Sequence, residues 1–458
     1  EVDGVNQAIA GSPHAPTPDE VVELANQILR GAFTGDFAVA LERASAFSQV
    51  MSAGASELAA SEDELIRSAA GYAGLAREFT AAANPHPGGR YLLKFWSVDY
   101  LADVWVNGVH VGAHEGGDGR FILDATDAIK PGAANLLSVR VLNPPADQII
   151  DGIVLNQTAH ASKGVWCWND GGIEGPVELL IVPSVWVEDV HIVPDPKSGD
   201  VAVHVSVHNS AQETVACRVG LWIAPAESGS RSDATEMLTQ LPPGTSTVDG
   251  HLHVDQFRLW QLDDPRLYRV NARVRVDGAS SFDEYVDRCG FRDFRIVDGF
   301  FCLNGKRVLL KGAQYSTHLP VNQCGGDLRE RTFFGRDELV KMKASGFNMV
   351  RILTRAPRPA QVQLCDELGL MIYSESLASW FMQDSPQLAE RWNRALKDVI
   401  TRERNHPSVV MWGLQNENTG DAVFDHSVRA LQFIRTLDET RPVLLNSGRF
   451  DRRPEIGS

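Results

Sequence analysis

The sequence predicts a multidomain protein in which two antiparallel β-sandwiches precede a parallel α/β sheet. Three observations support this fold class. The chain has 458 residues, more than one ordinary domain holds. From about residue 90, short runs of alternating apolar and polar residues are broken by turn residues, which is typical of antiparallel strands. After residue 297, apolar strand-like runs alternate with helix-like segments, as in a parallel sheet.

The first predicted unit spans residues 1–183. The pair Asn107-Gly108 lies between two alternating runs and is a strong β-hairpin signal. Residues 18–83 differ, because their apolar residues recur at helical spacing, for example over 63–79. We therefore predict a β-sandwich that carries a helical N-terminal insertion.

The second predicted unit spans residues 184–297. Strand-like runs at 201–207, 216–223 and 268–276 recur at the spacing of a sandwich. An immunoglobulin-like β-sandwich is expected here.

The third predicted unit spans residues 298–458. Gly346 and Gly369 follow predicted helices, where a glycine in the left-handed region often ends the helix. Strands are expected at 308–315, 349–353, 371–374, 409–414 and 443–446, and helices at 337–345, 359–368 and 387–405. Apolar strands that alternate with helices indicate a parallel sheet.

Four segments resemble glycoside hydrolase family 2, which includes β-galactosidases, β-glucuronidases and β-mannosidases. Residues 402–417 (RERNHPSVVMWGLQNE) are similar to the family's acid/base segment. Residues 301–312 are similar to the start of its barrel, and residues 364–373 to the passage into the third barrel strand. Residues 103–112 (DVWVNGVHVG) are similar to its N-terminal sugar-binding jelly roll. The resemblance implies a jelly roll, an immunoglobulin-like sandwich and a (β/α)8 barrel, in that order.

The barrel expected from this resemblance is incomplete. A (β/α)8 barrel takes ~250 residues, whereas only 161 residues run from Asp298 to Ser458. About five of eight strands can be assigned. An open fragment would leave bare strand edges, so we expect a second polypeptide or a C-terminal segment to complete the barrel.

Glu417 is the predicted catalytic acid/base. The apolar run 409–414 leads directly into Gln415-Asn416-Glu417, and barrel enzymes carry their chemistry at the C-terminal ends of strands. The resemblance implies that Glu417 protonates the leaving oxygen and that Asn416 binds the sugar 2-hydroxyl in a retaining mechanism. It also implies that the nucleophile, a glutamate on strand seven, is not in this chain.

Four further residues are predicted to bind substrate. Arg351, on the second strand, is expected to pair with an active-site carboxylate, although an ion pair at the edge of the core is an alternative. Glu375 ends the third strand, where it either contacts sugar or orients a neighbour. Trp380, in a loop, offers an aromatic face to a pyranose ring. His318 follows the first strand and either hydrogen-bonds sugar hydroxyls or caps a loop.

The amino-acid composition argues against some classes of binding partner. The net charge of −16 argues against nucleic acid and anionic membrane surfaces as partners. No apolar run approaches the ~20 residues that cross a bilayer, so a soluble chain is expected, while its compartment stays open between cytoplasmic and secreted or periplasmic. The six cysteines lack metal-ligand spacing; no metal and no cofactor are predicted.

The leading interpretation is a retaining exo-β-glycosidase that acts on a carbohydrate substrate and is present as a fragment or a subunit. An alternative is a non-catalytic carbohydrate-binding or scaffolding subunit of glycosidase ancestry. A metal-dependent hydrolase is disfavoured because the sequence contains no HExxH motif.

Overall fold

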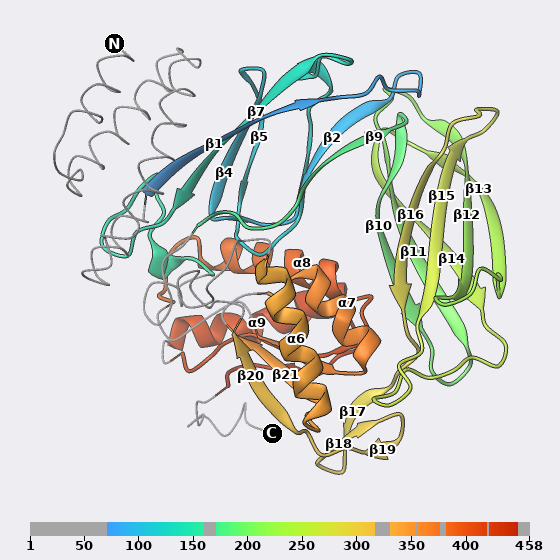
Figure 1. Ribbon diagram of the computed structural model, residues 1–458, viewed down its shortest axis with the longest axis vertical. Helices are drawn as coiled ribbons and strands as arrows, with labels where there is room; N and C mark the ends of the chain where they lie inside the picture. The colour runs from blue at the N-terminus through green and yellow to red at the C-terminus, as the bar shows by residue number, and fades with distance from the viewer. Residues whose placement is uncertain are drawn as a thin grey trace.

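The computed structural model describes residues 71–159, 171–316, 330–353, 356–375, 382–418 and 421–447. Figure 1 shows a β-sandwich at the upper left, a second β-sandwich at the right, and a group of helices with a parallel sheet between and below them. Two antiparallel sandwiches and a parallel α/β sheet with the start of a barrel confirm the predicted fold class.

The first sandwich contains a four-stranded sheet in the order β1-β7-β4-β5, a three-stranded sheet in the order β6-β2-β9, and the short pair β3-β8. Its elements are β1 Gly71–Thr80, β2 Arg90–Phe95, β3 Val98–Asp99, β4 Leu101–Val106, β5 Val109–Glu115, β6 Phe121–Asp124, η1 Thr126–Ala128, β7 Ala134–Asn143, η2 Leu155–Gln157, β8 Gly172–Ile173 and β9 Val177–Val182. Asn107 and Gly108 both have positive φ, 52° and 82°. These values suit a tight turn between β4 and β5, so the predicted hairpin is confirmed.

The helical insertion predicted over residues 18–83 is wrong at its C-terminal end. Gly71–Thr80 is the strand β1, which pairs antiparallel with β7 along all ten residues. The spacing of Leu75 and Phe79 suits a helix as well as a strand, and the open edge of β7 decides between them, because pairing satisfies the backbone of β1. The rest of the predicted insertion, residues 18–70, lies outside the described residues.

The second sandwich packs a sheet β10-β11-β14 against a sheet β13-β12-β15-β16. Its strands are β10 Val185–Pro194, β11 Asp200–Asn209, β12 Val215–Pro225, β13 Asp233–Leu241, β14 Gly244–His253, β15 Tyr268–Val276 and β16 Asp283–Cys289. Valines 201, 203, 205 and 207 of β11 are fully buried and alternate with more exposed residues. This period of two places one face of each strand in the core between the sheets.

The third part of the chain forms a five-stranded parallel sheet in the order β20-β21-β22-β23-β24. Its elements are β17 Phe294–Val297, β18 Phe300–Leu303, β19 Lys306–Arg307, β20 Gly312–Ser316, α6 Glu330–Ala344, β21 Met349–Leu353, α7 Pro359–Leu368, β22 Met371–Glu375, α8 Leu388–Glu403, β23 Val409–Gly413, α9 Asp421–Leu437 and β24 Val443–Leu444. Gly346 and Gly369 have φ of 85° and 66°, so both adopt the predicted left-handed conformation after a helix.

The barrel-like part has its own core. Trp392 of α8, Val350 and Ile372 of the sheet and Ile434 of α9 are buried together. β22 and β23 are buried along their whole length, because helices cover parallel strands. This packing fixes where the strands end.

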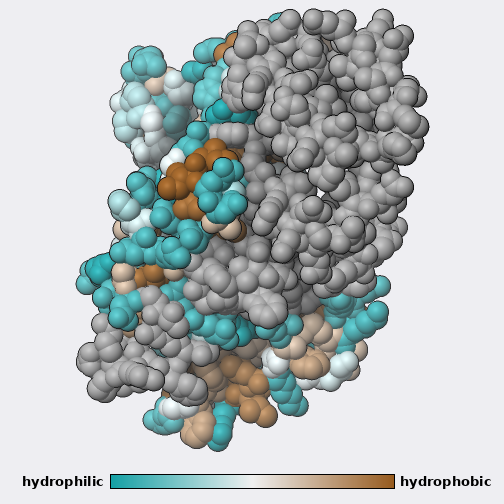
Figure 2. Space-filling view, turned by 90° about the vertical axis from the view of Figure 1, so that its left-hand side faces the viewer, coloured by the Kyte–Doolittle hydropathy of each residue, from teal (hydrophilic) through white to brown (hydrophobic). Residues whose placement is uncertain are grey.

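One face of the molecule shows apolar residues dispersed among polar ones. On the face in Figure 2, hydrophobic residues form separate brown patches among hydrophilic side chains. Scattered apolar residues of this kind are normal on a protein surface.

Candidate active site

The C-terminal ends of β21, β22, β23 and β24 meet at one edge of the parallel sheet. Four polar side chains converge there: Arg351 from β21, Glu375 from β22, and Asn416 and Ser447 from the segments that follow β23 and β24. Asn416 and Ser447 form a parallel β-bridge, so the two segments stay paired beyond their strands. Four neighbouring strands thus contribute to one polar cluster.

Arg351 is the centre of this cluster. Its Nη2 atom lies 2.6 Å from Glu375 Oε1, 2.7 Å from Asn416 Oδ1 and 2.6 Å from Ser447 Oγ. The Ser447 hydroxyl in turn donates to Glu375 Oε1 at 2.7 Å. A charge-assisted network of this kind is stiff, and it fixes the ends of four strands relative to one another.

Glu375 is the ion-pair partner of Arg351 and is only 1% exposed. Its other oxygen, Oε2, accepts a hydrogen bond from the Tyr373 hydroxyl. Burial raises the pKa of Glu375 above its ordinary value, although Arg351, Tyr373 and Ser447 act in the opposite direction. Both carboxylate oxygens therefore have protein partners, which matches the alternative that Glu375 orients a neighbour.

Asn416 is held with a defined orientation. The side chain is 4% exposed, and its Oδ1 accepts from Arg351. Because a guanidinium only donates, the oxygen of the amide must face Arg351. Its Nδ2 group has no hydrogen-bond partner within the described residues.

Glu417 is the exposed member of the sequence Gln415-Asn416-Glu417-Asn418. Its backbone N–H donates to Ser447 O at 2.8 Å, and its φ of 55° lies in the left-handed region that side chains with a Cβ rarely adopt. The carboxylate makes no hydrogen bond or ion pair to any residue that the structure describes. Backbone strain held by neighbouring contacts is typical of functional sites.

The residues on either side of Glu417 hold its backbone. Gln415 donates from Nε2 to Ser427 Oγ of α9 at 2.7 Å, and Asn418 donates from Nδ2 to Met382 O at 3.0 Å. Asn446 donates to Asn418 O at 2.8 Å. The exposed carboxylate therefore sits on a rigid support.

Two predicted site residues, Trp380 and His318, lie outside the described residues. Two residues absent from the prediction, Tyr373 and Ser447, belong to the cluster. Tyr373 had a usable signal, because residues two apart on a strand share a face and Glu375 was already a candidate. The only sequence signal for Ser447 was its position just after the last predicted strand.

The described residues contain neither a cluster of metal-ligating side chains nor a helix that could span a membrane. No group of three or more His, Cys, Asp or Glu side chains there is arranged to hold a metal ion. None of the described helices has the length and apolar character needed to cross a membrane.

Two β-sandwiches followed by a parallel α/β sheet, with polar side chains gathered where its strands end, define a multidomain chain of the sandwich-and-barrel class. The chain belongs to glycoside hydrolase family 2. The family model described as "Glycosyl hydrolases family 2, TIM barrel domain" matches residues 294–456, and the model described as "Glycosyl hydrolases family 2" matches residues 185–292.

Relatives agree with this assignment. A β-galactosidase of Yersinia pestis bv. Antiqua (strain Angola) is 29% identical over 398 residues, which are 81% of this chain and 36% of that protein. The chain therefore spans about a third of the length of the curated relatives it matches.

Solved structures of the same family are also similar. A family 2 member from Bacteroides cellulosilyticus DSM 14838 has 27% identity and a TM-score of 0.68, and the match covers 82% of this chain and 49% of that one. A β-glucuronidase from Parabacteroides merdae has 25% identity and a TM-score of 0.69, with 82% of this chain and 47% of that chain covered.

Proposed function

We propose that this chain carries the acid/base half of a retaining exo-β-glycosidase. The observation that supports the proposal best is the pairing of Asn416 with Glu417 at the end of β23. Asn416 has its amide oxygen bound by Arg351, and Glu417 extends from a rigid, strained backbone a carboxylate that pairs with none of the described residues. A proton donor for a glycosidic oxygen needs such access, because the substrate must reach it.

In the first step, a carboxylate nucleophile attacks the anomeric carbon while the bond from that carbon to the leaving oxygen breaks. Glu417 transfers its proton to this oxygen, and the aglycone leaves as an alcohol. In the second step, Glu417, now a carboxylate, takes a proton from water. The oxygen of this water attacks the anomeric carbon and releases the nucleophile, so the sugar leaves with its original configuration.

Asn416 and Arg351 have separate roles in this scheme. Asn416 donates from Nδ2 to the sugar 2-hydroxyl, an interaction that strengthens as positive charge develops at the adjacent carbon. Arg351 holds Asn416 through Oδ1 and is itself held by Glu375. Arg351 and Glu375 are therefore proposed as positioning residues for this step.

We further propose that the nucleophile and the remaining barrel strands come from outside the described residues, either from a C-terminal segment or from a second polypeptide. The parallel sheet has five strands within the described residues, and β20 and β24 are its edges. Unpaired edges of a parallel sheet favour pairing with further strands. The closed barrel would bring the second carboxylate opposite Glu417.

The sugar specificity is determined by assay on a panel of glycosides. Relatives of this chain carry the names β-galactosidase and β-glucuronidase, so both substrates belong in the first panel. Nitrophenyl β-galactoside, β-glucuronide and β-mannoside should be tested with the complete protein, or with the chain plus its completing partner.

The test compares Glu417→Gln with Glu439→Gln, a variant at an exposed glutamate remote from the cluster. Glu417→Gln should lower kcat/KM on a nitrophenyl glycoside by about 10²-fold or more, as expected for loss of general acid/base catalysis, whereas Glu439→Gln should retain wild-type activity. Unchanged turnover in Glu417→Gln would refute the acid/base assignment. Sugar binding without hydrolysis in the wild-type assembly would instead favour a carbohydrate-binding or scaffolding subunit.

A further inference from the structure

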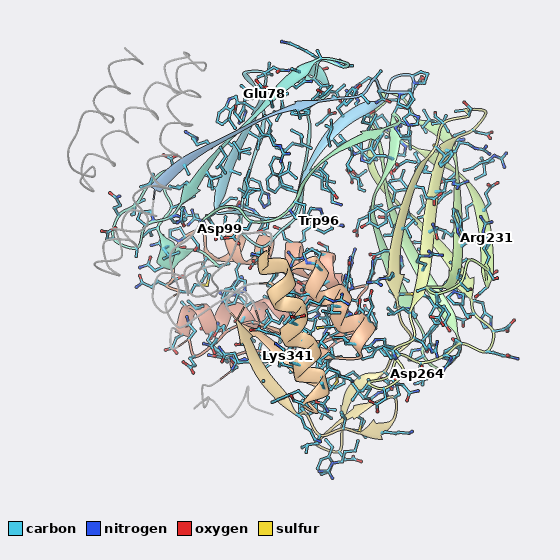
Figure 3. All side chains as sticks on the ribbon, viewed as in Figure 1. Glu78, Trp96, Asp99, Arg231, Asp264 and Lys341 are labelled. Carbon is cyan, nitrogen blue, oxygen red and sulfur yellow. The ribbon has the colours of Figure 1, made fainter. Side chains whose placement is uncertain are left out.

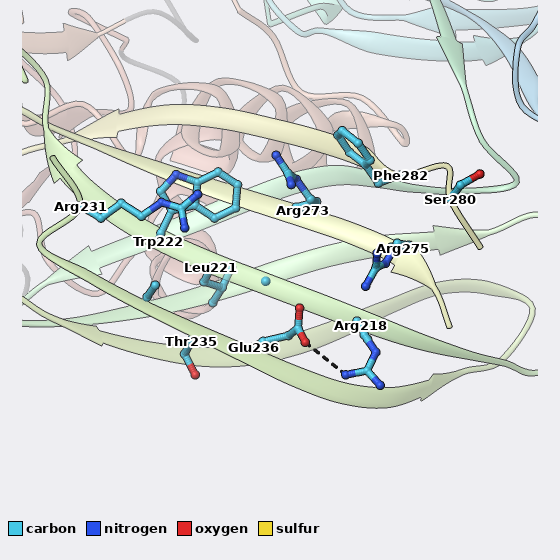
Figure 4. A pocket seen from close by; sticks show the side chains of 12 residues that line it. Arg218, Leu221, Trp222, Arg231, Thr235, Glu236, Arg273, Arg275, Ser280 and Phe282 are labelled. Carbon is cyan, nitrogen blue, oxygen red and sulfur yellow. Dashed lines mark hydrogen bonds and ion pairs between the residues drawn. The ribbon is translucent and has the colours of Figure 1, made fainter. Parts of the chain in front are cut away.

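A hollow lies on the outer face of the β13-β12-β15-β16 sheet (Figure 4). Its volume is about 500 Å³. Arginine and aromatic side chains dominate its lining: Arg218, Trp222, Arg231, Arg273, Arg275 and Phe282. None of these residues belongs to the cluster at the strand ends of the parallel sheet.

The hollow exists because Gly220 lies in the middle of the sheet face. Gly220 is opposite Glu236 of β13 and Arg273 of β15, between the larger residues Arg218 and Trp222 on its own strand. A Cβ at Gly220 would meet no atom within 4 Å. Glycine weakens a strand, so an empty place at the centre of a strand face suggests a use for the space.

Stacking orders the arginines around the hollow. The guanidinium of Arg231 lies 4.5 Å from the ring centroid of Trp222, and that of Arg273 lies 5.1 Å from Trp222 and 4.3 Å from Phe282. Figure 4 shows Arg231 lying along the face of Trp222. A guanidinium stacked on an aromatic face keeps its N–H edge free to bind an oxyanion.

Two of the four arginines have no acidic partner among the described residues. Arg218 pairs with Asp277 at 2.8 Å and with Glu236 at 3.2 Å, and Arg273 pairs with Glu284. Arg231 and Arg275 make no ion pair with any residue that the structure describes. Unpaired positive charge around a concavity is unusual in a chain of net charge −16, and it attracts anions locally.

We infer that this hollow binds an oligosaccharide that carries carboxylate or sulfate groups, with acidic groups at Arg231 and at Arg275 and a sugar ring above Gly220, which lies between them. The preference for an oxyanion follows from the two unpaired arginines and their planar N–H edges. The choice of a saccharide rests on the proposed function, because a glycosidase benefits from a second contact with its polymeric substrate.

The inferred site would hold the substrate chain at a distance from the cluster at the strand ends of the parallel sheet. Figure 3 labels Arg231 at the right-hand edge of the molecule, whereas Lys341 of α6 lies near the centre, beside the parallel sheet. A substrate chain bound at Arg231 would therefore raise the local concentration of its other sugars.

Binding of an oligogalacturonate, a sulfated oligosaccharide and a neutral oligosaccharide of equal length should be measured by calorimetry on the full chain. Gly220→Ile places a side chain in the hollow, at a position where an added Cβ meets no atom within 4 Å, and isoleucine favours strands. It should raise the Kd of the acidic ligands at least 10-fold, and the double variant Arg231→Gln with Arg275→Gln should do the same. The matched control is Gly74→Ile on β1, where an added Cβ also meets no atom within 4 Å; it should leave the Kd unchanged.

Equal binding of neutral and acidic ligands, or an unchanged Kd in Gly220→Ile, would overturn the inference. Equally tight binding of polyacrylate of matched charge would overturn the saccharide assignment. The Glu417→Gln variant separates a failure of this inference from a failure of the proposed function. It should bind the acidic oligosaccharide with the wild-type Kd, whatever its effect on hydrolysis. Loss of binding in that variant would place the ligand at the strand ends and contradict a second site.

Discussion

At the scale of single residues, Gly413 determines how close β22 and β23 can bring their side chains. Gly413 lies opposite Glu375 in the parallel pairing. A Cβ built on it would lie 2.6 Å from Glu375 Cγ and 2.6 Å from the Tyr373 hydroxyl. The space that a side chain would need is already filled by the buried partners of Arg351.

We predict that Gly413→Ala destabilises the protein and displaces Glu375. The expected loss is about 1–3 kcal/mol, as for other over-packed sites, and it should appear in urea unfolding. Gly312→Ala is the matched control in the same sheet, because its Cβ would come no closer than 3.6 Å to Met349. Equal stability of the two variants would contradict the role given to Gly413.

Some of the residues of the candidate site were predictable from sequence, and others were not. The position of Glu417 followed from an apolar strand that stops at an Asn-Glu pair, and the structure places both residues just beyond β23. The contact of Arg351 with Ser447 joins residues 96 positions apart. Only the parallel pairing of four strands brings them together, and no local pattern reports such a pairing.

At the scale of elements, the short segment between α8 and β23 joins two domains. Asn405 accepts from the Ile192 N–H at 2.9 Å and donates to Val190 O at 2.6 Å, so it completes the backbone hydrogen bonding of β10. The neighbouring Arg404 pairs with Asp189 at 2.7 Å. Part of the sequence that most resembles the family therefore has a structural role, in holding the second sandwich to the barrel-like part.

We predict that Asn405→Ala loosens this junction. It would leave two buried backbone groups of β10 without partners, at a cost of about 2–4 kcal/mol. Thermal unfolding should then begin at a lower temperature, and limited proteolysis should cut near the junction. Asn271→Ala, which removes a hydrogen bond to Glu284 on the sandwich surface, is the control and should change little. A similar shift in both variants would argue against a joining role.

Element boundaries were predictable where the sequence carries end signals. Helix α7 matches the predicted range 359–368, with Pro359 at its start and Gly369 in the left-handed conformation at its end. Helix α9, Asp421–Leu437, was not predicted, although it has a distinct apolar face that includes the buried Val423 and Ile434. Strand β1 was predicted as helix because its partner β7 lies about sixty residues away in sequence.

At the scale of the whole molecule, α8 holds the first sandwich against the barrel-like part. Glu115 at the end of β5 pairs with Arg391 at 2.6 Å and with Arg394 at 3.2 Å. Nearby, His114 lies 3.8 Å from Asp398. Burial raises the pKa of Asp398 to about 6 and lowers the pKa of His114 to about 4. The two shifts make the free energy of unfolding change with pH in opposite directions.

The signs follow from proton binding. Between pH 4 and pH 6 folded Asp398 binds more protons than the unfolded chain, so its contribution to the free energy of unfolding falls as pH rises. Folded His114 binds fewer protons than the unfolded chain, so its contribution rises over a similar range. In the wild type the two trends offset each other.

Asp398→Asn removes one of these trends. Relative to wild type, the variant should gain about 2–3 kcal/mol of unfolding free energy as pH rises from 4 to 6, which corresponds to the shift of Asp398 by roughly two pKa units. Urea unfolding at several pH values checks this. Parallel stability curves for the variant and the wild type would contradict a buried, proton-sensitive contact at α8.

The order of domains was the most predictable property of the molecule. Alternation with a period of two over 201–207 and the strand–helix alternation after residue 297 were enough to separate sandwich from parallel sheet, and the family comparisons agree. The way the parts dock was not predictable, because it depends on pairs such as Asp189 with Arg404 and Glu115 with Arg391, whose partners lie more than two hundred residues apart.

The most direct test of the acid/base role of Glu417 uses leaving groups of different basicity. A poor leaving group needs protonation by the enzyme, whereas a dinitrophenolate leaves without it. In the complete protein, Glu417→Gln should therefore lose at least 10²-fold more kcat/KM on a phenyl β-glycoside than on the dinitrophenyl β-glycoside of the same sugar. An equal loss on both substrates would mean that Glu417 does not transfer the proton.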